Sequence, residues 1–311
     1  MSSLVTVGET PLRVSPPDNR QFVDAREVGL AAAGTESNVA ITAACLGADS
    51  VWASRLPATQ LGRRVVAEIR EYGVDPDVTW AQEGRVGLEF TQRGVPPREP
   101  IVIQDRIEAT AASMTPSDLP MERVQAADGT FVSGSTAALS SITIDTLVAV
   151  LGAGRADGGL TVFDLDYRPR LWDAEEARES LTDVFEATDV LIANEDQLRT
   201  VFGRTGDPHQ VAHGVASQWD FEMLAMTRGE HGALVIHDSV LHECESIDTE
   251  TVDAAGQHAA FVGAFVRTLL EDEGPDSALY DGVAAATVAR TLPGPIPAVD
   301  PDDVQDVRAK L

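Results

Sequence analysis

Short apolar runs alternate along the chain with longer stretches in which apolar residues recur at helical spacing. The short runs predict strands, which lie at 4–9, 51–56, 129–134, 160–166, 189–194, 222–229, 232–238 and 240–245. The longer stretches predict helices at 36–47, 60–72, 142–151, 174–187, 258–271, 276–290 and 301–310. Strands separated by helices are typical of a parallel sheet covered on both faces. The pattern therefore predicts an α/β fold with a doubly wound, mostly parallel sheet in a single domain, 1–311.

Two segments, 10–33 and about 85–106, interrupt this alternation. Both contain Pro and Gly and short extended runs, such as VGLEFTQRG and PIVIQDR, and neither has a helical pattern. We expect these segments to form a small β flap inserted in the α/β core. Because ligands of open α/β sheets bind outside the carboxyl ends of the strands, a flap there would act as a lid that excludes water.

The chain is strongly acidic. Its 50 Asp and Glu and 23 Lys and Arg residues give a formal net charge of −27, and Lys310 is the single lysine. A field of this sign repels nucleic-acid phosphates, so we expect no nucleic-acid partner. Since salt screens the repulsion among surface carboxylates, the composition also predicts a halophilic protein that folds in a salt-rich cytoplasm.

The chain has no apolar stretch of roughly 18 residues, so we expect no membrane span. The N-terminus reads as the first strand of the fold rather than as a signal peptide, and the two cysteines, Cys45 and Cys244, form no ligand pair. A cytoplasmic protein with two structural thiols is the expectation. The histidines at 209, 213, 237 and 242 lack the spacing of a zinc site, so no metal site is predicted from them.

Residues 252–266, VDAAGQHAAFVGAFV, predict a turn at Gly256 that leads directly into a helix. A helix N-terminus after a glycine turn is suited to hold an anion such as phosphate. The residues at its mouth are Gln257, His258 and Ala259, and none of them is an obvious catalyst. The stretch therefore looks like a phosphate cradle without a base.

A series of motifs resembles the ribokinase (PfkB) family of sugar kinases, and most of all its 2-keto-3-deoxygluconate kinases. They occur in the family's order: GETPLRVSPP (8–17), GTESNVAITAACLGA (34–48), RLPATQLGRRVVAEIREYGVD (55–75), FDLDYRPRLW (163–172), ANEDQ (193–197), TRGEHGALV (227–235) and VDAAGQHAAFVGAF (252–265). The resemblance implies a Rossmann-like, ribokinase-like domain with a β lid, through which homodimers form. It also implies transfer of the γ-phosphate of ATP, with Mg²⁺, to a hydroxyl of a small-molecule sugar or sugar acid.

The resemblance assigns roles to individual positions. Those matching the sugar-acid site are Gly34, Asn38, Glu89, Gln104, Arg106, Asp166 and Arg168. Those matching the nucleotide site are Asn194, Gln197, Thr227, Gly229 and Gly232, and those matching the anion hole and base are Gly256, Gln257, His258 and Ala259. Two arginines can bind the carboxylate of a sugar acid in bidentate fashion.

Several of these positions depart from the family pattern. Ala259 stands where the family has its Asp base, and a methyl group accepts no proton. Gln257 and His258 replace small residues, and Gln197 replaces a Glu of the Mg²⁺ and phosphate motif. On the sugar side, Glu89 and Gln104 lie where the lid usually carries Tyr, and Asp166 replaces Asn. We expect Glu89 and Asp166 either to repel an anionic ligand or to pair with Arg168 or Arg106.

Three functions stay open at this point. The first is a kinase homologue that has lost efficient catalysis and serves as a binding or regulatory protein, including as the partner subunit of an active paralogue. The second is a working kinase whose site is rewired around His258 or a water-mediated carboxylate. The third is another enzyme on the same scaffold, such as a hydrolase. Ala259 favours the first, in which His258 only plugs the unused hole, and ATP and Mg²⁺ are cofactors only if the protein is active.

Overall fold

The computed structural model describes residues 2–95 and 97–311, so positions 1 and 96 of the predicted domain and flap lie outside the described residues. Its largest element is a nine-stranded sheet with the order β13-β12-β11-β10-β9-β8-β1-β4-β5. The strands are β1 (Ser3–Val7), β4 (Asp49–Pro57), β5 (Asp75–Ala81), β8 (Gly129–Ser133), β9 (Leu160–Asp164), β10 (Val190–Asn194), β11 (Met223–Thr227), β12 (Ala233–His237) and β13 (Val240–Cys244). Pairing is parallel from β5 to β11 and antiparallel at β12 and β13. The predicted α/β class with a mostly parallel sheet is confirmed.

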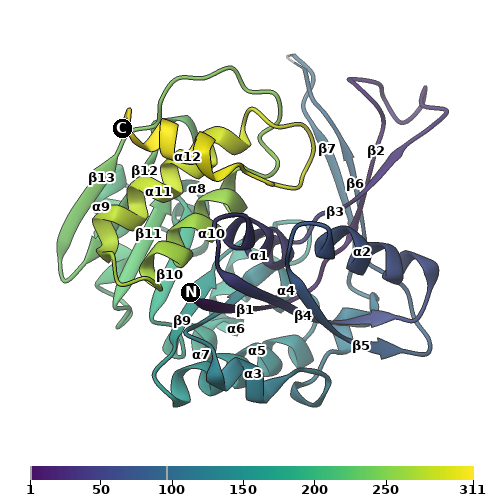
Figure 1. Cartoon of the computed structure of the whole chain (residues 1–311), viewed down its shortest axis with the longest axis horizontal. Helices are drawn as coiled ribbons and strands as arrows, with labels where there is room; N and C mark the ends of the chain where they lie inside the picture. Colours follow the sequence, from purple (N-terminus) through teal and green to yellow (C-terminus); the bar gives the residue numbers. More distant parts are fainter. Residues whose placement is uncertain (1, 96) are drawn as a thin grey trace.

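Helices cover both faces of this sheet (Figure 1). They are α1 (Thr35–Cys45), α2 (Gln60–Arg70), α3 (Met121–Ala126), α4 (Gly134–Ala137), α5 (Ser141–Ala156), α6 (Ala174–Ser180), α7 (Thr182–Glu186), α8 (Glu195–Val201), α9 (Pro208–Ala216), α10 (Gln257–Leu269), α11 (Gly274–Ala289) and α12 (Pro301–Arg308). Short 3₁₀ turns lie at Thr110–Ser113, Pro116–Asp118 and Gly229–His231. Within residues 2–95 and 97–311, we find no helix long and apolar enough to cross a membrane.

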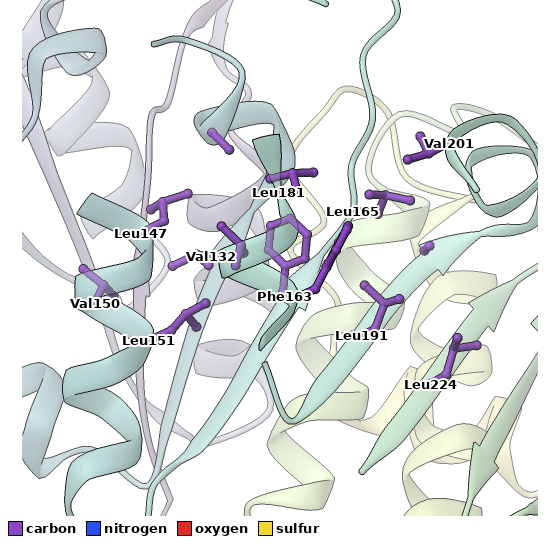
Figure 2. Packing of buried hydrophobic residues seen from close by; sticks show 14 of the residues in the cluster. Val132, Leu147, Val150, Leu151, Phe163, Leu165, Leu181, Leu191, Val201 and Leu224 are labelled. Carbon is purple, nitrogen blue, oxygen red and sulfur yellow. The ribbon is translucent and has the colours of Figure 1, made fainter. Parts of the chain in front are cut away.

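Neighbouring residues on the central strands alternate between two cores. Val132 and Leu191 pack on the side of α5, together with Leu147 of that helix (Figure 2). The next residue on β10, Ile192, packs on the opposite side with Phe265 of α10. Because both faces of the strands are buried, their sequences read as continuous apolar runs rather than as an alternation.

A second, four-stranded sheet has the order β3-β2-β6-β7 and projects from the core (Figure 1). Its strands are β2 (Leu12–Ser15), β3 (Gly29–Ala32), β6 (Leu88–Gln92) and β7 (Ile101–Asp105). They come from the two segments that lack a helical pattern, and we call this sheet the flap. In the parallel pair of β2 and β6, Arg13 lies beside Glu89, and Glu89 lies beside Gln104 of β7. Closure of the flap as a lid stays a prediction.

Candidate active site

The start of α10 lies where the sequence placed the phosphate cradle. Gly256 is its N-cap residue, and a Cβ there would come within 3.3 Å of the Pro295 carbonyl oxygen and 3.1 Å of the Pro297 side chain. A side chain at this position would therefore be tight against the segment that crosses it. Ala259, at the position of the family's base, is buried and packs in the core. A methyl group facing the core provides no proton acceptor.

His258 connects the start of α10 to the ends of two strands. Its Nε2 lies 2.8 Å from Oδ2 of Asp164, the last residue of β9, and its Nδ1 lies 3.2 Å from the hydroxyl of Thr227, the last residue of β11. The Asp164 side chain is fully buried, whereas that of His258 is 28% exposed. Burial lowers the pKa of His258, but the charge of Asp164 and its hydrogen bond raise it by more, and Asp166 adds to the rise. Both nitrogens of the imidazole are therefore engaged by neighbouring side chains, and the protonated form of His258 is favoured.

A cleft of about 580 Å³ opens beside His258 at the carboxyl ends of β10 and β11. It is lined by Asn194, Glu195, Asp196, Thr227, Arg228, Gly229, Glu230, His231, Thr251, Ala254, Gln257, His258 and Arg290. Such a volume is in the usual range for small-molecule sites. The structure thus brings the expected Asn194, Thr227 and Gly229 to one cleft.

Two of the expected nucleotide-site residues have structural roles that the sequence did not indicate. The Gln197 backbone N–H donates to Asn194 Oδ1 over 2.8 Å, and the Asn194 N–H donates to Gln197 Oε1 over 3.0 Å. This is a capping box at the start of α8, in which Gln serves as well as Glu. At Gly232, φ is +80° and a Cβ would overlap the carbonyl oxygen of Cys244, so the turn requires glycine.

Gly34 and Asn38 on the sugar side also have contacts within the chain. A Cβ at Gly34 would come 2.6 Å from the carbonyl oxygen of Glu9, which explains the glycine by packing. The side-chain amide of Asn38 donates to the carbonyl of Pro295 over 2.8 Å. Their predicted contacts with a sugar stay predictions.

The arginines expected to bind a sugar acid are paired with carboxylates of the chain itself. Arg106 Nε donates to Glu9 over 2.6 Å, and both side chains are almost fully buried. Burial lowers the pKa of Arg106, but the charge and hydrogen bond of Glu9, together with the charges of Glu36 and Asp166, raise it by more. Arg168 lies 2.7 Å from Asp166 Oδ1, while the hydroxyl of Thr35 donates to the other oxygen of Asp166 over 2.7 Å. The expected pair of Asp166 and Arg168 is therefore present.

Glu89 differs from the expectation, because its partner is neither Arg106 nor Arg168. Arg13 donates to Glu89 through Nε and Nη2 at 2.7 Å, and the amide of Gln104 donates to its second oxygen at 2.6 Å. Burial raises the pKa of Glu89, but the charges of Arg13 and Arg168 and the hydrogen bonds from Arg13 and Gln104 together lower it by more, so the net direction is downward. Arg13 is the neighbour of Glu89 across the parallel strands, a register that the sequence alone does not give.

Glu36 is a buried carboxyl that our reading of the sequence missed. It is fully buried in α1 and accepts hydrogen bonds from the hydroxyls of Ser133 and Thr136 over 2.7 and 2.6 Å. Burial raises its pKa to about 7, against the lowering effect of these hydrogen bonds. The available signal was that Glu36 is the single charged residue of a helix whose other residues are small, polar or apolar.

A doubly wound sheet, a strand-built flap and a cleft at the carboxyl strand ends together define a carbohydrate kinase scaffold. The model of the pfkB family of carbohydrate kinases matches residues 1–302, and the chain belongs to this family. It is 40% identical over 306 residues to a 2-dehydro-3-deoxygalactonokinase of Haloferax volcanii, covering 98% of this chain and 96% of that protein.

Solved structures agree with this assignment. A 2-dehydro-3-deoxygluconokinase of Thermotoga maritima superposes with a TM-score of 0.93 at 25% identity and covers 99% of this chain and 98% of its own. A putative ribokinase II from E. coli, in complex with ATP and Mg²⁺, superposes with a TM-score of 0.89 at 19% identity over the full length of both chains. The second likeness shows the fold alone.

Proposed function

We propose that this chain binds a carbohydrate as a pfkB-family protein in which phosphoryl transfer from ATP is strongly reduced or lost. The observation that carries the proposal is the start of α10, where Ala259 is a buried methyl and both nitrogens of His258 are engaged by Asp164 and Thr227. The proton of an acceptor hydroxyl has no carboxylate to go to at this position. Loss of a general base alone slows such a reaction by roughly 10²–10⁴-fold.

The ancestral reaction in this proposal is phosphorylation of a sugar acid, by analogy with the relatives named as 2-dehydro-3-deoxygalactonokinase and 2-dehydro-3-deoxygluconokinase. ATP would supply the phosphoryl group. The cleft has room for a nucleotide, and Asn194, Glu195 and Asp196 place on its wall the oxygen donors that Mg²⁺ prefers. At the phosphate end of the cleft, however, the lining residues are Gln257 and His258. The lining is therefore better suited to binding a nucleotide than to transferring its phosphate.

A working kinase that uses His258 is the second candidate, and one observation favours it. His258 is hydrogen-bonded to a buried carboxylate and is partly exposed at the cleft, as a general base has to be. Against it, the second nitrogen is engaged by Thr227 and the raised pKa favours the protonated form, which cannot accept a proton. A regulatory or partner-subunit role would follow from the first candidate.

The test is ATP consumption with Mg²⁺ and a panel of sugars and sugar acids in molar KCl. We expect turnover far below about 1 s⁻¹, and turnover above that value would overturn the proposal. The triple variant Gln257→Ala, His258→Gly, Ala259→Asp restores the family pattern and should raise the rate at least about 100-fold. His213→Ala, exposed on α9 and outside the lining of the cleft, is the control and should leave the rate unchanged.

The triple variant also removes the partner of Asp164, so its thermal melt is measured alongside the rate. A folded triple variant that gains no activity would contradict the view that the start of α10 limits catalysis. If the triple variant does not fold, the single variant Ala259→Asp, which keeps His258, gives the same comparison.

A further inference from the structure

The charged groups around the sugar side form one connected cluster, which we call the charge cluster. It consists of the carboxyl groups of Glu9, Glu36, Glu89, Asp164 and Asp166, the guanidinium groups of Arg13, Arg106 and Arg168, and the imidazole of His258. The charges of Glu36 and Asp166 act on Arg106, that of Arg168 acts on Glu89, and those of Asp166 and Arg168 act on His258. The charge state of each of these groups therefore depends on its neighbours in the cluster.

The cluster carries no excess of positive charge. Each guanidinium group lies within 2.7 Å of a carboxylate oxygen of the chain, Arg13 on Glu89, Arg106 on Glu9 and Arg168 on Asp166. The carboxyl groups outnumber the guanidinium groups, five to three. Even with His258 protonated and Glu36 neutral, the net charge reaches only zero. A carboxylate ligand would therefore meet guanidinium groups whose charge is already neutralised by carboxylates of the chain.

The unsatisfied polar atoms in the same region are mostly acceptors. Among the described residues, the buried oxygens without a hydrogen-bond partner include Glu9 Oε1, Asn38 Oδ1 and Gln104 Oε1, and Arg168 Nε is a nitrogen without one. Buried acceptors of this kind are complemented by O–H donors. A carboxylate offers acceptors only, whereas a sugar hydroxyl offers a donor and an acceptor.

From charge and hydrogen-bond capacity together, we infer that the carbohydrate site selects an uncharged polyhydroxyl ligand over a sugar acid, and that Asp166 is the residue that determines this preference. Asp166 is nearly fully buried, is held by the hydroxyl of Thr35, and neutralises the arginine nearest to it. With Asn at this position, the 2.7 Å ion pair would be lost and Arg168 would gain an uncompensated charge. This inference rests on the proposed function, because it takes the sugar side as a ligand site.

The test measures ligand binding by calorimetry without ATP, at the lowest KCl concentration that keeps the protein folded. The probes differ only at C1: glucitol, gluconate and glucamine, and the matching galactitol, galactonate and galactamine set. We expect wild type to bind a neutral member at least about 10-fold more tightly than its acid. A difference of this size corresponds to one ion-pair contact at an intermediate dielectric constant. Tighter binding of the acid or the amine than of the neutral member, or no binding of either neutral probe, would overturn the inference.

The variant Asp166→Asn should shift the ratio of acid to neutral affinity about 10-fold toward the acid. Asp105→Asn is the matched control, because Asp105 is an exposed carboxylate of the flap that pairs with Arg85, and it should leave the ratio unchanged. An unchanged ratio in Asp166→Asn, or an equal shift in both variants, would contradict the role given to Asp166. Since no ATP is present, these results are independent of the turnover assay, which alone tests the loss of phosphoryl transfer.

Discussion

Replacing His258 by alanine is expected to destabilise the fold, because the imidazole is the partner of a fully buried carboxylate. In wild type, Asp164 Oδ2 lies 2.8 Å from His258 Nε2, while Oδ1 accepts the backbone N–H of Asp166 over 3.1 Å. Removing the imidazole leaves Oδ2 without this partner in a site that has no exposed surface. The Thr227 hydroxyl also loses its contact with Nδ1.

The size of the effect follows from burial. Breaking a buried ion pair by removing one member costs about 3–5 kcal/mol. His258 is 28% exposed and lines the cleft, so water can enter the space that it vacates and solvate part of Asp164. We therefore expect the lower end, about 3 kcal/mol of unfolding free energy. For a chain of this size, that loss corresponds to a decrease of about 5 °C in Tm.

The loss should depend on pH in a defined direction. The pKa of His258 is raised in the fold, so its stabilising contribution is complete below the unfolded pKa of about 6.5 and is lost as pH rises through the folded pKa. The charges facing the imidazole are those of Asp164, Asp166 and Arg168. The difference in stability between wild type and His258→Ala should therefore be larger at pH 6 than at pH 9.

The assay is denaturant unfolding in molar KCl at both pH values. His258→Gln is the matched control, because an amide can still donate to Asp164 but does not titrate, so it should lose less stability and show no such pH dependence. His231→Ala, in an exposed turn, should be neutral. If His258→Ala is as stable as wild type at pH 6, the imidazole does not hold the fold together here, and the case for His258 as a free base in the cleft becomes stronger.

Three further predictions concern other parts of the molecule. The pKa of Glu36 is raised from its ordinary value of 4.5 to about 7 in the fold. Wild type should therefore lose about 3 kcal/mol of unfolding free energy relative to Glu36→Gln as pH rises from about 4.5 to 7.5. Unfolding titrations measure this loss, and a constant difference between the two proteins would contradict the prediction. Gly232→Ala should lower Tm far more than Gly229→Ala, since both have positive φ but only Gly232 faces an obstructing carbonyl; equal losses would count against the steric argument. The Tm should rise steeply between about 0.1 and 3 M KCl as salt screens the net charge of −27, and a Tm independent of salt would remove the halophilic expectation.

Most of the fold could be predicted from the sequence because the central strands are buried on both faces. Strands such as β8 and β10 have almost no exposed residue, so their apolar runs are unambiguous. The edge strand β5 was missed, since it is partly exposed on both sides and has no such run. The predicted helix 174–187 is two helices, α6 and α7, which meet at Leu181.

The partners at the site could not be predicted, because they are distant in the sequence. His258 and Asp164 are 94 positions apart, and Arg106 and Glu9 are 97 apart. The family pattern places these residues near a ligand but does not say which charges neutralise each other. That depends on strand register and on the side on which the flap meets the core, which local patterns do not encode.

Three of the unusual residues of this site are stabilised by contacts within the chain, and this bears on how the site arose. Gln197 completes a capping box, His258 joins Asp164 to Thr227, and Asp166 is held between Thr35 and Arg168. Random damage would be expected to leave buried polar groups without partners, each at a cost of about 1–3 kcal/mol. Instead, Gln197, His258 and Asp166 each make hydrogen bonds within the chain. These three side chains are therefore satisfied without a bound phosphate, as the proposed binding role requires.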